Sequence, residues 1–367
     1  MIKVCHITSA HGEEDVRIFH KECVSLAKNG YEVYLVQRGE SYEKNGVKLA
    51  GFGEVPSGRI KRILLASRIA YKKALEIDAD IYHFHDPDLL PYGEKLAKMG
   101  KHVIFDCHES TLESIEEKTW IPAFLRPVVA FFFDLLQRRV CRRLDAVVIV
   151  SPNERCHFES FAKHIACVTN YPILKENDLQ LPRENRVAFA GGISQQWDHH
   201  RVIEALEQLP DCRYWLCGGV DDGYLEQLQQ LKGWAQTDYM GMIPHSQVAE
   251  GLARSRVGHS LLIPGKNTDG QVGTLGNTKI FEEMMAGLPV VCTNFDLWRE
   301  FVERYHCGIC VDPTNTQEIA DAIRYLLEHP DEAQQMGENG RRAVREEFNW
   351  GVEEKKLFAL YEDILNQ

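Results

Sequence analysis

Short runs rich in valine and isoleucine alternate with amphipathic segments of helical length, and this alternation constrains the fold more than any other feature of the chain. The first set of predicted strands lies at residues 3–7, 32–36, 81–85, 102–106 and 146–150. The helices predicted with them lie at residues 15–29, 59–76, 88–99, 123–144 and 153–161. Strands that alternate with helices in this way form a parallel sheet with right-handed crossovers. We therefore expect an α/β fold with a doubly wound parallel sheet.

A polar stretch with two prolines, residues 171–184, interrupts this pattern and predicts a linker. The alternation then restarts, with predicted strands at residues 186–190, 214–217, 257–263, 289–292 and 308–311. The predicted helices of this second set lie at residues 198–208, 224–232, 279–286 and 316–328. The chain is thus expected to form two Rossmann-like domains, residues 1–170 and 185–350. Such sheets bind ligands outside the carboxyl ends of their strands, so we expect a site in a cleft between the domains.

The charge of the chain disfavours one class of partner. There are 42 basic and 54 acidic residues, the net charge is −12, and the acidic excess lies in the second half. A protein that binds the nucleic-acid backbone needs a basic face, so we expect no nucleic-acid partner.

Neither the N-terminus nor the cysteines indicate export. The first strand begins at once, without the apolar region of a secretory signal, and the eleven cysteines are scattered through predicted strands and helices. Cys307 and Cys310 have the spacing of half a metal site, but no second pair follows, and no metal site is expected. We expect a cytoplasmic protein with free thiols.

A glycine-rich loop, Gly273 to Thr278, leads into a short predicted helix and is the most informative segment for function. The free amide groups of Gly276 to Lys279, the positive end of the helix dipole and the Lys279 ammonium can together hold a diphosphate. Glu282, one turn further on, can accept hydrogen bonds from vicinal hydroxyl groups. The loop therefore predicts a site for a nucleotide.

The same segment is also compatible with an ordinary capped helix. In that interpretation Asn277 or Thr278 is the N-cap, Lys279 and Glu283 form a surface pair, and Gly287 ends the helix. The sequence alone leaves both interpretations open.

Several segments resemble one family of enzymes. Lys279 to Glu282, followed by Gly287 to Val291, resembles the donor-binding signature of retaining glycosyltransferases of family 4, also called glycosyl transferases group 1. Further segments that resemble this family are Thr8 to Phe19, His83 to Pro91, Phe105 to Glu109, Phe189 to Ile193 and Phe348 to Trp350. The resemblance implies the GT-B fold, in which two Rossmann-like domains face each other. It also implies that the last helix, residues 351–367, packs back on the first domain.

The activity that this resemblance implies is transfer of a sugar from a nucleoside-diphosphate sugar, UDP- or GDP-linked, to an acceptor hydroxyl. The anomeric configuration would be retained, and no metal or other cofactor would be required. The donor would bind to the second domain and a saccharide or lipid-linked acceptor to the first. The expected setting is assembly of a polysaccharide, O-antigen, capsule or glycolipid.

The resemblance also implies roles for individual residues. Lys279 would hold the diphosphate, Glu282 the ribose hydroxyls, and His108 would lie beside the donor sugar; these three are the expected catalytic residues. The full donor-binding set implied is Gly191, Gly192, Gly218, Gly219, Met242, Ile243, Thr274, Leu275, Gly276, Asn277, Thr278, Lys279 and Glu282. For His108, a histidine at a strand end bonded to local backbone is the alternative.

Two positions depart from the family pattern. Thr274 stands eight residues before Glu282, where the family has its first acidic residue. After Ile193, where relatives place a basic residue, this chain offers only a protonated His199 or Arg201, and Arg201 is as easily a solvated helix residue. These departures favour a second hypothesis, a non-catalytic protein of the same fold that binds a nucleotide sugar or acts as a scaffold. A nucleotide-sugar 2-epimerase is disfavoured, since its Gly-Thr-Arg-Pro-Glu turn is missing after the first strand.

Candidates for contact with the acceptor lie on turns at the carboxyl ends of the first strands. They are His11, Asp15, Arg17, His85 and Asp86. Alternatively, Asp15 caps the following helix and Arg17 lies on the surface.

Residues 122–143 combine aromatic side chains with clustered arginines, as helices that lie on anionic membranes do. Peripheral contact with the inner face of the cell membrane would suit a lipid-linked acceptor. The alternative is a long packing helix in which Phe131 to Phe133 belong to the core. The longest apolar stretch is shorter than the roughly 20 residues that span a bilayer.

Overall fold

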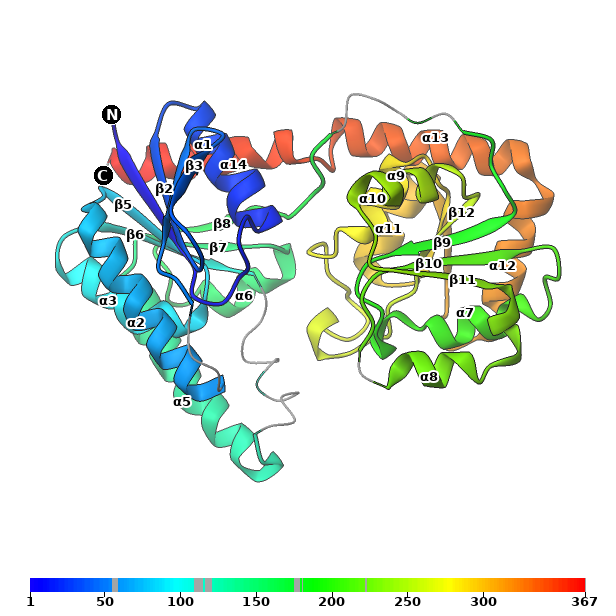
Figure 1. Ribbon diagram of the computed structural model, residues 1–367, viewed down its shortest axis with the longest axis horizontal. Coiled ribbons are helices and arrows are strands. Elements are labelled where there is room, and N and C mark those ends of the chain that lie inside the picture. The colour runs from blue at the N-terminus through cyan, green and yellow to red at the C-terminus, as the bar shows by residue number, and fades with distance from the viewer. Residues whose placement is uncertain are drawn as a thin grey trace. The chain divides into compact units, whose positions relative to one another are not determined.

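The computed structural model describes residues 1–54, 59–108, 115, 121–174, 179, 181–221 and 223–366. Within it the chain forms two compact units (Figure 1). The first unit contains residues 1–170 and 350–367, and the second contains residues 171–349. The chain therefore passes between the units twice, after Asn170 and after Asn349.

The first unit contains an eight-stranded sheet with the order β3-β4-β2-β1-β5-β6-β7-β8. Its strands are β1 Lys3–Ile7, β2 Glu32–Gln37, β3 Tyr42–Lys44, β4 Val47–Gly51, β5 Ile81–Phe84, β6 His102–Cys107, β7 Ala146–Ile149 and β8 Ile165–Cys167. Every neighbouring pair is parallel except β3 with β4. The predicted parallel sheet is confirmed, whereas β3, β4 and β8 were not predicted.

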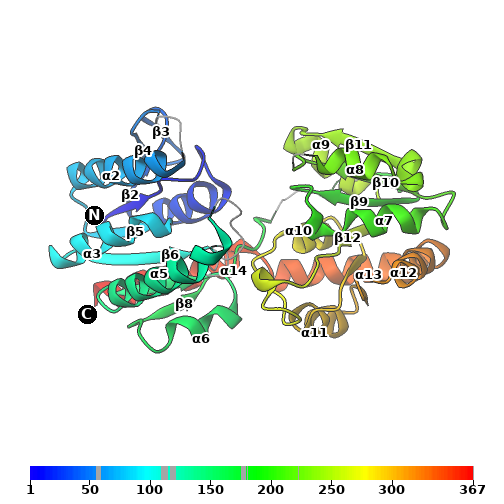
Figure 2. The same ribbon diagram turned by 90° about the horizontal axis from the view of Figure 1, so that it is seen from below.

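The helices of the first unit lie on both faces of this sheet (Figure 2). They are η1 Val16–Cys23, α1 Val24–Lys28, α2 Arg59–Ile77, η2 Pro87–Leu89, α3 Leu90–Lys98, η3 Ala123–Leu125, α5 Arg126–Cys141, η4 Pro152–Glu154, α6 Arg155–Phe158 and α14 Trp350–Leu365. Successive residues of β1 belong to opposite faces, because Val4 packs with η1 and α14 while Cys5 packs with α2, α3 and α5. Both faces are therefore buried, as a doubly wound sheet requires.

The last helix, α14, completes one of these faces. The indole Nε1 of Trp350 donates to Ser25 Oγ at 2.8 Å, and Glu353 accepts from the Thr169 amide at 2.8 Å. Leu357 and Tyr361 are fully buried against β1, β2 and η1. The final segment is thus part of the hydrophobic core of the first unit.

The second unit contains six parallel strands in the order β11-β10-β9-β12-β13-β14. They are β9 Arg186–Ala190, β10 Arg213–Cys217, β11 Thr237–Gly241, β12 Val257–Ser260, β13 Val290–Thr293 and β14 Gly308–Val311. Its helices are η5 Gln195–Trp197, α7 His199–Leu206, α8 Tyr224–Gln229, η6 Lys232–Gln236, α9 His245–Ala253, η7 Lys266–Thr268, α10 Lys279–Met285, α11 Asp296–Tyr305, α12 Thr316–Glu328 and α13 Pro330–Glu346. The sequence pattern missed β11, α9, α11 and α13.

No helix in the described ranges has the length and apolar character needed to cross a membrane. One alternative for residues 122–143 was a packing helix in which Phe131 to Phe133 belong to the core, and the structure of α5 corrects it. Phe131 and Phe132 are 60% and 64% exposed, so they do not belong to the core. Phe133 is partly buried and packs against the core of the first unit.

We predict that Leu357→Ala destabilises the first unit by about 2–5 kcal/mol, because it leaves a cavity under α14 where the native side chain is fully buried. Denaturant unfolding followed by circular dichroism measures the change. Lys355→Ala, an exposed position on the same helix, is the matched control. Equal stability of the two variants would contradict the assignment of α14 to the core.

Candidate functional site

In the second unit, Lys279 lies across the glycine turn that follows β9. A Cβ atom on Gly191 would lie 2.0 Å from Lys279 Cε, so a larger residue at this position would displace the end of this side chain. The Lys279 ammonium lies 4.2 Å from the ring centroid of Trp197 and 5.7 Å from that of Phe189. Burial lowers the pKa of Lys279, while Glu282 and Glu283 oppose this effect. The ammonium therefore makes cation–π contacts with two aromatic rings, which hold it in this position.

The glycine turns after β9 and β10 pack directly against each other. A Cβ on Gly218 would lie 1.8 Å from the carbonyl oxygen of Gly191, and Gly218 has a φ of 140°. A Cβ on Gly219 would lie 3.4 Å from the sulfur of Met242, which is 82% exposed. The structure thus brings together Gly191, Gly218, Gly219 and Met242 of the predicted donor set. Gly192 is exposed in the first of these turns, and Ile243 packs beside the end of β10.

Hydrogen bonds to Thr274 stabilise the loop before α10. Thr274 Oγ1 accepts from the Gly276 amide at 3.1 Å, and the Thr274 carbonyl accepts from Trp298 Nε1 at 2.7 Å. The Gly276 amide therefore already has a partner, contrary to our expectation that it is free. Thr278 is the N-cap residue of α10, but its side chain makes no capping bond.

The remaining members of the predicted donor set, Leu275 and Asn277, are half-buried in this loop. Lys279 is the first residue of α10, and Glu282 lies one turn further along. Gly287, with a φ of 72°, follows the end of the helix as predicted.

Glu283 is not the surface partner of Lys279 that the capped-helix interpretation expected. Its side chain is buried and accepts a hydrogen bond from Ser260 Oγ at 2.9 Å. Burial raises the pKa of Glu283 to about 8, although the Ser260 hydrogen bond lowers it. The carboxyl group is therefore largely protonated at neutral pH.

Neither candidate for the missing basic residue contributes as expected. His199 is fully buried with its Nδ1 atom 2.7 Å from the Tyr214 hydroxyl, and burial together with His259 lowers its pKa well below its ordinary value. The prediction that a protonated His199 replaces the missing basic residue is therefore wrong. Arg201 donates to Asp198 at 2.8 Å and is partly exposed, which agrees with the alternative of a solvated helix residue.

In the first unit, Asp86 organises the turn after β1. Its Oδ2 atom accepts from the Ser9 amide at 2.6 Å and from Thr8 Oγ1 at 2.8 Å, and its Oδ1 atom lies 3.1 Å from His11 Nδ1. Burial alone would raise the pKa of Asp86, but these partners, above all His11, hold it well below its usual range. Asp86 also raises the pKa of His11, against the effect of burial.

Asp15 and Arg17 make different interactions at the start of η1. Asp15 caps η1, because its Oδ1 atom accepts from the amides of Arg17 and Ile18 at 2.9 and 3.0 Å. Arg17 is buried and pairs with Asp106 through two nitrogen atoms, with Nη2 and Oδ2 3.0 Å apart. The capping alternative for Asp15 is confirmed. The surface position expected for Arg17 is wrong, and as a candidate for acceptor contact it is inaccessible.

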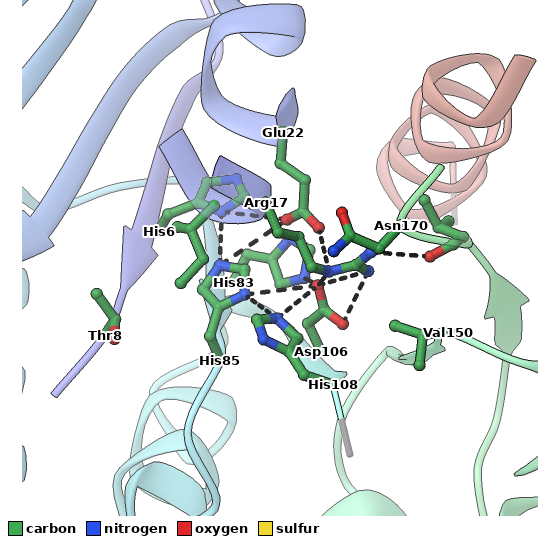
Figure 3. Close-up of polar contacts among 12 residues, drawn as sticks. His6, Thr8, Arg17, Glu22, His83, His85, Asp106, His108, Val150 and Asn170 are labelled. Atoms are coloured by element: carbon green, nitrogen blue, oxygen red, sulfur yellow. Dashed lines mark hydrogen bonds and ion pairs between the residues drawn. The ribbon is translucent and has the colours of Figure 1, made fainter. Parts of the chain in front are cut away.

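A row of histidines lies beside this ion pair, at the carboxyl ends of β1, β5 and β6 (Figure 3). His6 Nδ1 is 2.9 Å from His85 Nε2, and His85 Nδ1 is 3.0 Å from His108 Nε2. Burial lowers the pKa of His85 to about 4, so this ring is neutral at physiological pH. His85 is therefore buried away from any acceptor, whereas the side chain of His108 is 16% exposed.

Among the described residues, the side chain of His108 contacts two other side chains. Besides His85, its Nε2 atom lies 3.3 Å from Asp106 Oδ2. The backbone that directly follows His108 lies outside the described residues, so the alternative of a histidine bonded to local backbone stays open. His108 belongs to the first unit and Lys279 to the second.

Two family models match adjacent parts of the chain. "Glycosyltransferase Family 4" matches residues 17–170, and "Glycosyl transferases group 1" matches residues 174–343. The chain belongs to the glycosyltransferases of family 4 and group 1. A curated relative, MMP alpha-(1->4)-mannosyltransferase of Mycolicibacterium hassiacum, is 32% identical over 82 residues, which cover 22% of this chain and 20% of that protein.

Solved structures of glycosyltransferases have the same GT-B fold. Sucrose-phosphate synthase from Thermosynechococcus elongatus is 17% identical with a TM-score of 0.76, and the alignment covers 100% of both chains. Anabaena HepE in complex with UDP and glucose is 16% identical with a TM-score of 0.71, over 99% of this chain and 100% of that one. WaaG, a glycosyltransferase involved in lipopolysaccharide biosynthesis, is 14% identical with a TM-score of 0.69, over 97% and 98% of the two chains.

Sequence reasoning missed several residues of both polar sites in this family 4 chain. In the first unit they are His6, Glu22, His83 and Asp106, and in the second Trp197. A usable signal was present, because histidines at positions 83 and 85 and the pair Asp106 and His108 are each two residues apart. Such spacing places both side chains on one face of a strand or its extension.

We predict that the stability of the second unit falls with rising pH because of Glu283. Between pH 5 and pH 8 the unfolded chain releases a proton that the native carboxyl group retains, so unfolding becomes easier by about 1.4 kcal/mol per pH unit. Denaturant unfolding at several pH values should show that this slope is absent in Glu283→Gln. The exposed Glu328→Gln is the control, and an identical slope in wild type and Glu283→Gln would contradict the prediction.

Proposed function

We propose that this chain is a retaining glycosyltransferase that moves a hexosyl group from a UDP- or GDP-linked donor to an acceptor hydroxyl, without a metal at the diphosphate. The observation that carries the proposal is the fixed position of Lys279, whose ammonium lies over Trp197 beside the Gly191 turn. A cation held at the carboxyl end of a parallel sheet can bind a diphosphate favourably, because its side chain loses little further conformational entropy on binding.

The donor is assigned to the second unit. Lys279 and the uncapped start of α10 supply positive charge for the diphosphate, and Glu282 can accept from the ribose hydroxyls. The close glycine turns at Gly191 and Gly218 leave room for the backbone to approach the nucleotide. A solved structure of the same fold contains UDP and glucose, which supports a uridine nucleotide as the first choice.

The proposed reaction is a front-face displacement. The oxygen of the leaving phosphate takes the proton of the acceptor hydroxyl while the bond to the sugar breaks, and Lys279 stabilises the charge that develops on the diphosphate. By resemblance to the family, His108 donates a hydrogen bond to the sugar or phosphate. Thr274 replaces the first acidic residue, and with its side chain bonded to the Gly276 amide, the contacts to the donor sugar fall to the loop backbone or to Asn277.

The acceptor is assigned to the first unit, where the predicted candidate His11 is partly exposed and lies beside Asp86. A saccharide or lipid-linked acceptor would place the chain in assembly of a polysaccharide, O-antigen, capsule or glycolipid. The exposed apolar side chains of η3 and α5 support peripheral contact with the inner face of the cell membrane. They are Phe124, Leu125, Val128, Val129, Phe131, Phe132 and Leu135.

We predict that the protein binds one of UDP, GDP, ADP and TDP in calorimetric titration, equally with and without Mg²⁺. Lys279→Ala should weaken binding at least tenfold, because a hydrogen bond to a charged group contributes about 1.5–3 kcal/mol. Glu282→Ala should weaken nucleotide binding but not binding of inorganic diphosphate. The exposed Lys232→Ala is the matched control. Binding of none of the four nucleotides by the folded protein would overturn the catalytic proposal and favour a scaffolding role.

We also predict that the protein floats with vesicles that contain phosphatidylglycerol. The double variant Phe131→Ser and Phe132→Ser should lose most of this binding, since it removes two large exposed apolar surfaces. Met99→Ser, at another exposed apolar side chain of the same unit, is the control. If the double variant floats as well as the wild type, α5 is not the membrane contact.

A further inference from the structure

Three side-chain atoms at the carboxyl ends of β5 and β6 form a triangle. His85 Nδ1 lies 3.0 Å from His108 Nε2 and 3.5 Å from Asp106 Oδ2, and the edge between His108 Nε2 and Asp106 Oδ2 is 3.3 Å. We propose that His85, Asp106 and His108 bind a divalent transition-metal ion of the zinc type. This site would lie in the first unit and shares only His108 with the proposed transferase. It is distinct from the diphosphate site at Lys279 in the second unit, which needs no metal.

The dimensions of the triangle suit one ion. Zinc binds nitrogen and carboxylate oxygen at about 2.0–2.2 Å, and ligands at tetrahedral angles are then about 3.3–3.5 Å apart. The three observed edges, 3.0, 3.3 and 3.5 Å, differ from this spacing by a few tenths of an ångström. Two imidazoles and one carboxylate leave at least one coordination position open.

The backbone fixes the spacing of the three ligands. Phe84 of β5 is paired with Phe105 of β6, so continuing this register by one residue places His85 beside Asp106. His108 follows Asp106 by two residues and lies on the same side of the strand extension. The ligands therefore converge because neighbouring parallel strands end together.

The outer partners of a metal site are also present. His85 is bonded through its other nitrogen, Nε2, to His6 Nδ1 at 2.9 Å. Asp106 accepts from Arg17 through both of its oxygens, at 3.0–3.1 Å. Metal-binding histidines and carboxylates are usually held by such second partners, which fix their orientation.

Arg17 is the nearest positive charge and would oppose a cation. Its guanidinium already lies between two carboxyl groups, with Nη2 3.0 Å from Asp106 and Nε 3.0 Å from Glu22, and Nη1 donates to the Val168 carbonyl at 3.0 Å. Burial raises the pKa of Glu22 well above its ordinary value, so Asp106 is the carboxylate that balances Arg17, and an ion would share Asp106 with Arg17.

A deeper group of ligand atoms, from His6, Glu22, His83 and His85, is also close enough for a metal. All four residues are fully buried in the described part of the unit, so that group offers no route of entry. In the triangle, by contrast, the side chain of His108 is 16% exposed, so one ligand residue reaches the surface of the unit. Without an ion, a single shared proton between His85 and His108 accounts for their contact, and this is the alternative to be tested.

The test is titration of the chelator-treated full-length protein with Co²⁺, in a Cys156→Ser background that removes the exposed thiol. We expect one ion per chain, with visible absorption bands of bound cobalt but no thiolate charge-transfer band, and displacement by Zn²⁺. His108→Ala should weaken binding at least tenfold. His102→Ala, at a partly exposed histidine of β6, should leave it unchanged.

Absence of saturable cobalt binding, or binding that His108→Ala leaves intact, overturns the proposal. Since Asp106 supports the fold through Arg17, Asp106→Asn serves as a second variant only if circular dichroism shows a native spectrum. It should weaken cobalt binding as well. Nucleotide titration in the presence of chelator measures binding at the donor site without metal. The two titrations therefore distinguish failure of the metal-site proposal from failure of the proposed transferase.

Discussion

The arrangement of the first unit depends on the burial of one charge. A guanidinium does not lose its proton in a protein, so Arg17 can be buried only among acceptors. Asp106 of β6 and the carbonyl of Val168, after β8, accept its hydrogen bonds, and Glu22 of η1 lies within ion-pair distance. The need to pair Arg17 therefore holds the first helix against two strand ends. It also fixes the carboxylate around which His85 and His108 lie.

Much of the fold follows from the alternation of apolar runs with amphipathic segments. Strands such as β1 and β9 are buried on both faces and read directly as runs of apolar residues. The pattern fails where burial is incomplete or side chains are small. Strand β3 has only three residues, two of them charged and exposed, and the turn at Asn45 and Gly46 is the better signal for the hairpin of β3 and β4. Helix α13 packs through small residues, since a Cβ on Gly337 would lie 2.1 Å from the Gly287 carbonyl oxygen.

The polar sites were predicted less completely because their contacts are remote in sequence. The loop around Lys279 has a local pattern of glycines and a helix start, and this pattern was sufficient to single it out. The two aromatic rings beside Lys279 come from β9 and η5, more than 80 residues earlier, and no local pattern indicates them. Likewise, Arg17 and Asp106 are 89 residues apart. Each is a charged residue, and a charged residue considered alone is expected on the surface. Only the folded sheet brings such pairs together.

The position of α14 has a consequence for the order in which the chain acquires its structure. Ser25 and Trp350 are separated by 325 residues, yet they meet in one core. During synthesis from the N-terminus, the face of the first sheet that receives Leu357 and Tyr361 stays uncovered until the final helix emerges. The second unit is continuous in sequence and has no such delay. The unit that is made first is thus completed last, and in the interval its apolar face requires protection from aggregation.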